Sequence, residues 1–314
     1  MRSNIFRILF YLCFLALILL CLFWGLSAGE GYILLAVRLP NLLVALISGA
    51  SLGLAGALSQ MIFRNPLADP YILGVSAGSS AGISLAFLTG AYTLLGYFSI
   101  FILSFSGGIF ALLVIFSVYS ASRRKDTVIL LLSGVIFGYI AVSLTSLILS
   151  NLEGNIIFSL TEWLFGTTAF FDMTIIGIFA LLLLVVIIIS LMRHRSLDRM
   201  YLSDKKMLSL GEDPIANRKF FFFLIALLVS FSVSVTGIIG FLGLIAPHIA
   251  RRLKGSNAKS MIPLSAITGA FLLTAAHLLS LIVKGIRVPV GISISLMGGI
   301  YFIILLRRGY ASEI

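Results

Sequence analysis

The residues with the most unusual chemistry lie in a short polar segment, 61–78, between two apolar stretches. This segment brings Arg64, Asp69 and two prolines into one turn and then continues into small residues that start at Gly74. Non-helical backbone inside a membrane must be covered by protein or line a water-filled path, because lipid cannot satisfy its polar groups. A re-entrant turn followed by a glycine-faced helix therefore indicates a transport pathway. A passive helical bundle would have little use for such a turn.

The sequence contains no combination of residues that suits bond-making chemistry. It has no P-loop pattern, no HExxH motif, no Cys/His metal cluster and no nucleophile with a neighbouring base. His277 is the only ionisable residue well inside an apolar stretch, and a lone histidine there is more often a hydrogen-bonded packing residue. Ion-coupled carriers usually keep ionisable groups at the midplane, so this pattern disfavours both a secondary carrier and an intramembrane enzyme. We expect no catalytic residue, cofactor or resident metal, and any ATP-driven step needs a separate subunit.

The composition is that of a helical membrane protein that crosses the bilayer many times. The 314 residues are 60% hydrophobic and only 11% charged. Apolar stretches long enough to span a bilayer recur along one domain, residues 1–314, and predict about ten transmembrane helices. They fall near 8–27, 38–60, 72–90, 94–119, 128–150, 173–192, 219–236, 238–250, 261–283 and 288–306.

The basic residues predict the orientation of the chain. With both termini in the cytoplasm, all but three of the 22 lysines and arginines lie in inner segments, as the positive-inside rule requires. The three outer ones are Arg38, Lys284 and Arg287. The net charge of +11 is thus mostly a topology signal, and its spread over separate loops argues against nucleic-acid binding.

Two connecting segments contain residues that a simple linker would not need. The long inner loop, 193–219, has an Asp213–Pro214 pair typical of a helix start, and Leu208, Leu210 and Ile215 give its short helices an apolar side. We interpret this loop as a docking element for a cytoplasmic partner. In the alternative interpretation, the loop's acidic residues only offset its basic ones.

The outer segment 151–172 is acidic and aromatic, and two interpretations of it remain open. Trp163 suits an interfacial anchor at the lipid headgroups. The same residues, with Gly166, also suit a short helix that lines the outer mouth of a pathway. Elsewhere, small residues spaced by four, such as Gly49 and Gly53, indicate close helix packing.

These motifs together resemble the permease subunits of bacterial ABC importers for iron–siderophore, haem and cobalamin, over nearly the whole chain. The matching blocks are Arg38-Leu-Pro40, Phe63-Arg-Asn-Pro-Leu-Ala-Asp-Pro-Tyr-Ile-Leu-Gly-Val-Ser-Ala-Gly78, Leu130-Leu-Leu-Ser-Gly134, Trp163 with Gly166, Leu208-Ser-Leu-Gly-Glu212, Gly240-Phe-Leu-Gly-Leu-Ile-Ala-Pro-His-Ile-Ala-Arg251, Ile262-Pro263 and Pro289-Val-Gly291. The resemblance implies the all-α, inverted-repeat fold of a type II importer permease in the inner membrane of a prokaryote. It also implies a homodimer with two ATP-binding subunits beneath it, an extracytoplasmic substrate-binding protein above it and a metal chelate as cargo.

The resemblance also assigns expected roles to particular residues. The Asn-Pro-Leu turn suggests an inner gate at Asn65, Pro66 and Leu67, with Thr127 from the loop before the fifth span. In the alternative, Asn65 only caps a helix. The contact with the ATPase is expected at Leu210, Gly211 and Glu212, and the binding protein is expected to dock on Arg38, Lys284 and Arg287. The alternative for these three is snorkelling to the lipid headgroups.

The sequence departs from the family pattern where the docking residues are expected. Ala276 and Ser280 occupy the places of an expected Asp and Arg at the end of the ninth span, and Arg287 stands where the family favours Glu. We therefore expect Lys284, one helical turn beyond Ser280, to present a replacement charge. A ferric siderophore or haem is the expected cargo, with cobalamin, molybdate or another chelate as alternatives.

Overall fold

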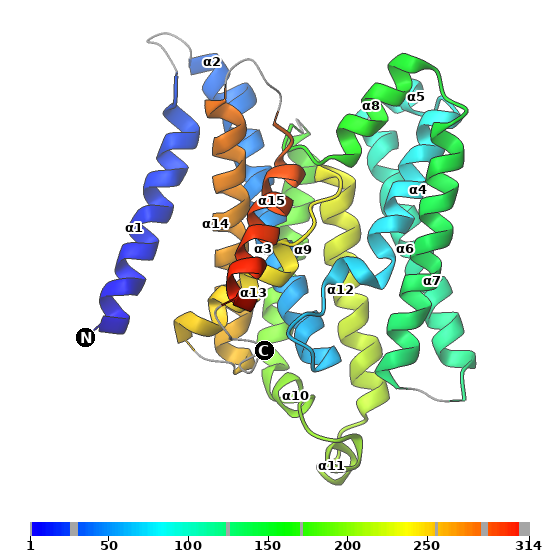
Figure 1. Ribbon diagram of the computed structural model, residues 1–314, viewed down its shortest axis with the longest axis vertical. Coiled ribbons are helices and arrows are strands. Elements are labelled where there is room, and N and C mark those ends of the chain that lie inside the picture. Colours follow the sequence, from blue (N-terminus) through cyan, green and yellow to red (C-terminus); the bar gives the residue numbers. More distant parts are fainter. Residues whose placement is uncertain are drawn as a thin grey trace.

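The computed structural model describes residues 2–25, 31–123, 126–169, 172–254, 257–283 and 288–307. In this part of the chain the regular structure is entirely helical (Figure 1). The helices are α1 (Arg2–Phe23), α2 (Gly31–Ile33), the π-helix η1 (Leu34–Arg38), α3 (Leu39–Phe63), the 3-10 helix η2 (Pro70–Leu73), α4 (Val75–Leu88), α5 (Tyr92–Leu95), α6 (Tyr97–Ala121), α7 (Thr127–Leu149), α8 (Gly154–Leu164), α9 (Met173–Met192), α10 (His194–Arg199), α11 (Asp204–Ser209), α12 (Pro214–Thr236), α13 (Leu242–Lys254), α14 (Ala258–Ile282) and α15 (Val290–Arg307).

The expected apolar stretches coincide with helices. Among the described residues, six segments are long and apolar enough to cross a membrane: Gly31–Phe63, Phe98–Ala121, Thr127–Leu149, Met173–Met192, Pro214–Thr236 and Ala258–Ile282. Three shorter apolar helices, Leu9–Phe23, Val75–Leu88 and Val290–Leu305, match three more of the expected spans. The remaining expected span corresponds to α13, which has only 13 residues and ends in a basic cluster. The count of ten crossings therefore stays a prediction.

The ends of the helices are arranged as the charge pattern predicts. In Figure 1, α1 begins and α15 ends toward the end of the molecule that carries α10 and α11, whereas α5 and α8 lie at the opposite end. The basic inner loop, the start of α1 and the end of α15 thus lie toward the same end of the molecule. This arrangement agrees with a chain whose two termini share one side of the membrane.

Helix α3 forms the centre of the fold. Every residue from Ser51 to Phe63 is buried, because α12, α13 and α14 all pack against this helix. The contact with α14 is so close that a Cβ atom added at Gly53 would overlap the carbonyl oxygen of Ser265. The glycine spacing that the sequence shows on this helix therefore serves backbone-to-backbone packing, as expected.

Helices α4, α6 and α7 form the part of the bundle farthest from α1 (Figure 1). Helix α7 lies at its margin, and apolar side chains on its outer face, such as Tyr139 and Leu147, are 73% and 63% exposed in the single chain. In a membrane such a face contacts lipid or another subunit.

Candidate functional site

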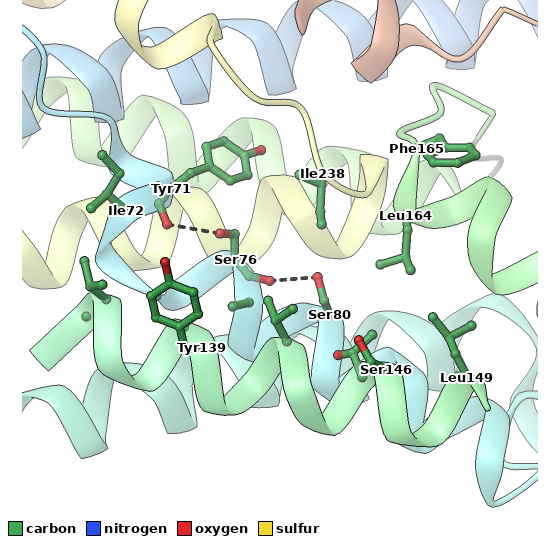
Figure 2. Close-up of a pocket in the computed structure, with 17 residues that line it drawn as sticks. Tyr71, Ile72, Ser76, Ser80, Tyr139, Ser146, Leu149, Leu164, Phe165 and Ile238 are labelled. Carbon is green, nitrogen blue, oxygen red and sulfur yellow. Dashed lines mark hydrogen bonds between the residues drawn. The ribbon is translucent and has the colours of Figure 1, made fainter. Parts of the chain in front are cut away.

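A cavity of about 600 Å³ lies between α4 and α7, next to the 3-10 helix η2 and the end of α8 (Figure 2). The 61–78 segment supplies one wall of the cavity: after α3 ends, η2 turns the chain so that α4 starts beside α7. The lining residues are Tyr71, Ile72, Gly74, Ser76, Ala77, Ser80, Gly134, Val135, Gly138, Tyr139, Val142, Thr145, Ser146, Leu149, Leu164, Phe165 and Ile238.

The polar groups of this cavity are hydroxyls, and several are already hydrogen-bonded to backbone. Ser76 Oγ donates to the carbonyl oxygen of Tyr71 at 3.4 Å, and Ser80 Oγ donates to that of Ser76 at 3.0 Å (Figure 2). Thr145 Oγ1 donates to the carbonyl oxygen of Ala141 at 3.0 Å. Each of these hydroxyls therefore keeps acceptor capacity while its proton is committed to the helix.

The lining, as far as the structure describes it, includes no charged side chain. Aromatic and aliphatic groups alternate with hydroxyls, which suits a bulky ligand with a mixed surface. The hydroxyls of this lining offer weak polar contacts to a ligand.

The segment expected at the outer mouth forms the short helix α8 followed by a tight connection. Its last residues, Leu164 and Phe165, line the cavity, and Trp163 packs partly buried against the cluster of Ile83, Phe87 and Leu160. Trp163 is thus held by protein contacts, which favours the second of the two interpretations of this segment. Its role as an outer mouth stays a prediction.

Gly166 joins three elements directly after α8. It has a φ of 85°, its carbonyl oxygen accepts from Val290 N at 3.2 Å, and the next residue, Thr167, donates from its backbone N to Thr236 O at 2.8 Å. A Cβ atom at Gly166 would lie 2.8 Å from the carbonyl oxygen of Ile238. Only glycine fits this position, which ties α8 to the end of α12 and the start of α15.

His277 lies in a smaller polar cavity of about 220 Å³ next to Gly166. Its side chain is 2% exposed, and its Nδ1 atom is hydrogen-bonded to Thr168 Oγ1 at 2.8 Å. This confirms the expectation that His277 is a hydrogen-bonded packing residue.

The residues expected to form the inner gate lie in a well-ordered turn after α3. Asn65 Oδ1 accepts from Leu67 N at 2.9 Å, Asn65 O accepts from Ala68 N at 3.0 Å, and Asn65 N donates to Gln60 O at 3.2 Å. Asn65 and Pro66 line a polar pocket of about 390 Å³ at the α10 end of the molecule, whereas Leu67 is 47% exposed. The asparagine therefore stabilises its own turn, and the gating role stays a prediction.

Thr127 lies apart from that pocket within the single chain. It is the first residue of α7, directly after Asp126, whose side chain caps the helix by accepting from Ile129 N at 3.0 Å. The structure thus brings Asn65, Pro66 and Leu67 together and leaves Thr127 on a different element.

The inner loop contains the predicted short helices and the predicted cap. Asp213 accepts from the backbone N of Ile215 at 2.8 Å and of Ala216 at 3.2 Å, and Pro214 is the first residue of the following helix. That helix is the long α12, so the loop ends at 213 rather than at 219. Leu208 and Leu210 are 60% and 51% exposed and form the expected apolar edge.

Glu212 faces the interior of this loop. Its Oε1 atom accepts from Arg199 Nη1 at 2.5 Å and from Ser196 Oγ at 3.1 Å, and its Oε2 atom accepts from Asn217 Nδ2 at 3.0 Å. The carboxylate therefore holds α10, the turn 210–213 and α12 together. Of the three residues expected to meet the ATPase, Leu210 is at the surface, while Glu212 supports the loop from inside.

Of the three expected docking residues, only Arg38 lies within the described part of the chain. It ends η1 and is half-buried, and its Nη2 atom donates to the carbonyl oxygen of Trp24 at 3.2 Å. Lys284 and Arg287 lie outside the described residues. The docking surface stays a prediction.

Comparison with known proteins assigns this architecture to a family. The pattern of the FecCD transport family matches residues 5–308. The chain belongs to this family. It is a multi-pass permease subunit of an ABC importer in the cytoplasmic membrane, as the resemblance implied.

The names of similar proteins mention different cargo. The chain is 32% identical to the iron(3+)-hydroxamate import permease FhuG of Bacillus subtilis, with 90% of this chain and 85% of FhuG covered. It is 30% identical to the hemin transport permease HmuU of Yersinia pestis, with 91% and 86% covered. It is 33% identical to the molybdate import permease MolB of Haemophilus influenzae, with 90% and 83% covered.

A solved structure supports the fold. An inward-facing conformation of a metal-chelate type ABC transporter matches with a TM-score of 0.85 and 29% identity, covering 95% of this chain and 97% of that one. The agreement extends over nearly every helix and confirms the all-α permease fold.

The sequence does not indicate the cavity wall that α7 provides. Gly134 of α7 appeared only in a block that matches the family, and Tyr139, Ser146 and Ser80 did not stand out at all. One usable signal existed: Ser76, Ser80 and Ser84 repeat every four residues, which places hydroxyls along one side of α4. Nothing local indicates which helix that side faces.

Proposed function

We propose that two copies of this chain form the membrane passage of an importer for a ferric siderophore or haem, driven by two separate ATP-binding subunits. The observation that carries the proposal is the 600 Å³ cavity, whose wall combines aliphatic and aromatic groups with hydroxyls. A ferric chelate presents a large, mixed surface of this kind and needs a wide passage with weak contacts. Membership of the FecCD family supports the same class of cargo.

The cargo choice within the family follows from the charge of the wall. A small oxyanion such as molybdate would lose its hydration water on entering this cavity. The described lining residues include no cationic side chain to replace that water, so the desolvation of the anion is costly. A chelate spreads its charge over a larger surface and carries apolar groups of its own. The wall therefore favours an iron chelate over molybdate, with cobalamin as the alternative bulky chelate.

The assembly follows from the surfaces of the single chain. The exposed apolar face of α7 supports pairing with a second copy, so that two cavities would share one passage. The apolar edge of Leu208 and Leu210 supports contact with an ATP-binding subunit, since this chain has no P-loop of its own. An extracytoplasmic binding protein would deliver the chelate from the other side.

Transport in proteoliposomes tests the proposal. The purified permease, its ATP-binding subunit and the binding protein are reconstituted, and uptake of a ferric hydroxamate, ferric citrate, haem, cobalamin and molybdate is measured with and without ATP. We expect ATP-dependent uptake of one iron chelate. Uptake of molybdate alone would refute the cargo, and uptake driven by an ion gradient without the ATP-binding subunit would refute the class.

A further inference from the structure

Arg64 occupies an unusual position between the end of α3 and the inner loop. It is the residue that ends α3, with a left-handed φ of 50°, and it directly precedes the turn of Asn65, Pro66 and Leu67. Its side chain reaches across to the loop, where Nε donates to the carbonyl oxygen of Met200 and Nη2 donates to Asp204 Oδ1 at 3.0 Å. One arginine thus connects the turn to the end of α10 and the start of α11.

Asp204 completes a bridge between three elements. The same oxygen, Oδ1, also accepts from Arg218 Nη2 at 2.5 Å. Arg218 belongs to the first turns of α12, and its side chain is only 3% exposed. A single carboxylate on α11 therefore holds two guanidinium groups, one from the end of α3 and one from the buried start of α12.

The carboxylate at the centre of this bridge is ionised at neutral pH. Burial acts to raise the pKa of Asp204, but the hydrogen bonds and positive charges of Arg218 and Arg64 outweigh it and hold that pKa below its ordinary value. The carboxylate stays ionised, so both contacts are charge-assisted.

The turn beyond Arg64 is tied together as a unit. Its backbone and side-chain hydrogen bonds connect Asn65 with Gln60, Leu67 and Ala68, and Ala68 is 5% exposed. A displacement of Arg64 therefore carries the turn with it, because the turn has little internal freedom. The left-handed φ of Arg64 marks the junction of α3 and the turn.

We infer that Arg64 is a positioning residue for the turn 65–68, and that the Arg64–Asp204–Arg218 bridge transmits movement of α11 to that turn. The transport meaning of this link rests on the proposed function, in which an ATP-binding subunit presses on the loop that contains α11. In this arrangement Asp204 carries the movement. Glu212 bonds instead to α10 and α12.

A thiol probe on the purified permease alone tests the bridge without any assumption about partners. In a background with Cys13→Ala and Cys21→Ala, Ala68→Cys places a buried thiol in the turn, and its rate of modification by a water-soluble reagent measures how often the turn opens. We expect Asp204→Asn to raise that rate about three- to tenfold, because two charge-assisted contacts are lost. Arg64→Gln should raise it to a similar extent.

The controls separate positioning from a general loss of structure. Asp204→Glu should return the rate toward the parent value, and the Arg64→Gln/Asp204→Asn double variant should add little to Arg64→Gln alone, since that change already breaks the bridge. Glu212→Gln removes a carboxylate of the same loop whose bonds go to α10 and α12, and should leave the rate near the parent value. A second probe, Ser190→Cys on α9, lies in a fully buried position and should react equally slowly in all variants.

The same probe in the assembled complex tests transmission. With the ATP-binding subunit bound, ATP should change the modification rate of the thiol at position 68 in the otherwise parental permease, and Asp204→Asn should abolish that change while the subunit remains bound. An unchanged modification rate at position 68 in Asp204→Asn alone, or additive effects in the double variant, would overturn the inference. If the subunit does not bind the parent chain, the proposed function fails. The modification rates measured on the permease alone still test the bridge.

Discussion

Replacement of Leu210 by aspartate should separate this permease from its ATP-binding subunit. Leu210 ends α11 at the edge of the inner loop and is 51% exposed, so about half of its side chain remains for a partner to cover. Full burial of a leucine side chain is worth about 1.5 to 3 kcal/mol, so covering this half contributes about 1 kcal/mol to binding. Loss of that contact alone would weaken binding roughly fivefold.

The aspartate adds a second cost that is larger than the first. A carboxylate that is covered by the partner loses water without a matched donor, which costs at least about 2 kcal/mol. Together the two effects come to about 3 kcal/mol, or roughly a hundredfold weaker binding. Since the side chain leaves the protein core untouched, the permease itself should fold normally.

The measurement is the affinity of the ATP-binding subunit for the permease in lipid nanodiscs, together with the ratio of ATP hydrolysed to chelate transported. Leu210→Met keeps the apolar surface and serves as the matched control, with expected affinity close to that of the parent. Tight binding and normal coupling in Leu210→Asp would show that the subunit contacts another surface.

Three further predictions test the gate, the outer surface and the core. Cysteine at Asn65 in both protomers, once cross-linked, should stop transport until a reductant is added, and normal transport in the linked state would place the gate elsewhere. Arg38→Glu should weaken association with the binding protein about threefold at low salt and less at high salt, as expected for a charge at an interface rim. If the affinity equals that of the parent and does not depend on salt, Arg38 has only a structural role through its contact with Trp24. Gly53→Ala should destabilise the permease by about 1 to 3 kcal/mol in thermal or denaturant unfolding, because the new Cβ overlaps the carbonyl oxygen of Ser265. Gly177→Ala on α9, where a Cβ meets nothing within 4 Å, is the matched control and should be close to neutral.

The sequence alone determined the class of this protein and most of its helices. Apolar length and the distribution of lysine and arginine are local properties, so they predicted the membrane segments and the shared side of the two termini without any tertiary contact. The cap at Asp213–Pro214 could be predicted for the same reason, since a cap involves only residues within one helical turn. The 63–78 block identified the family because its unusual residues are contiguous.

The tertiary structure decided which surfaces face one another. The sequence indicated that Gly53 allows close packing, but only the fold shows that α14 is the neighbour that uses it. The cavity needs the walls of α4 and α7 and the end of α8 at once, and the direction of each wall depends on how the helices are rotated about their axes. The bridge from Arg64 to Asp204 joins residues 140 positions apart, and Glu212 proved to face inward. Side-chain direction in such cases is set by contacts between distant segments, which helical periodicity in the sequence leaves open.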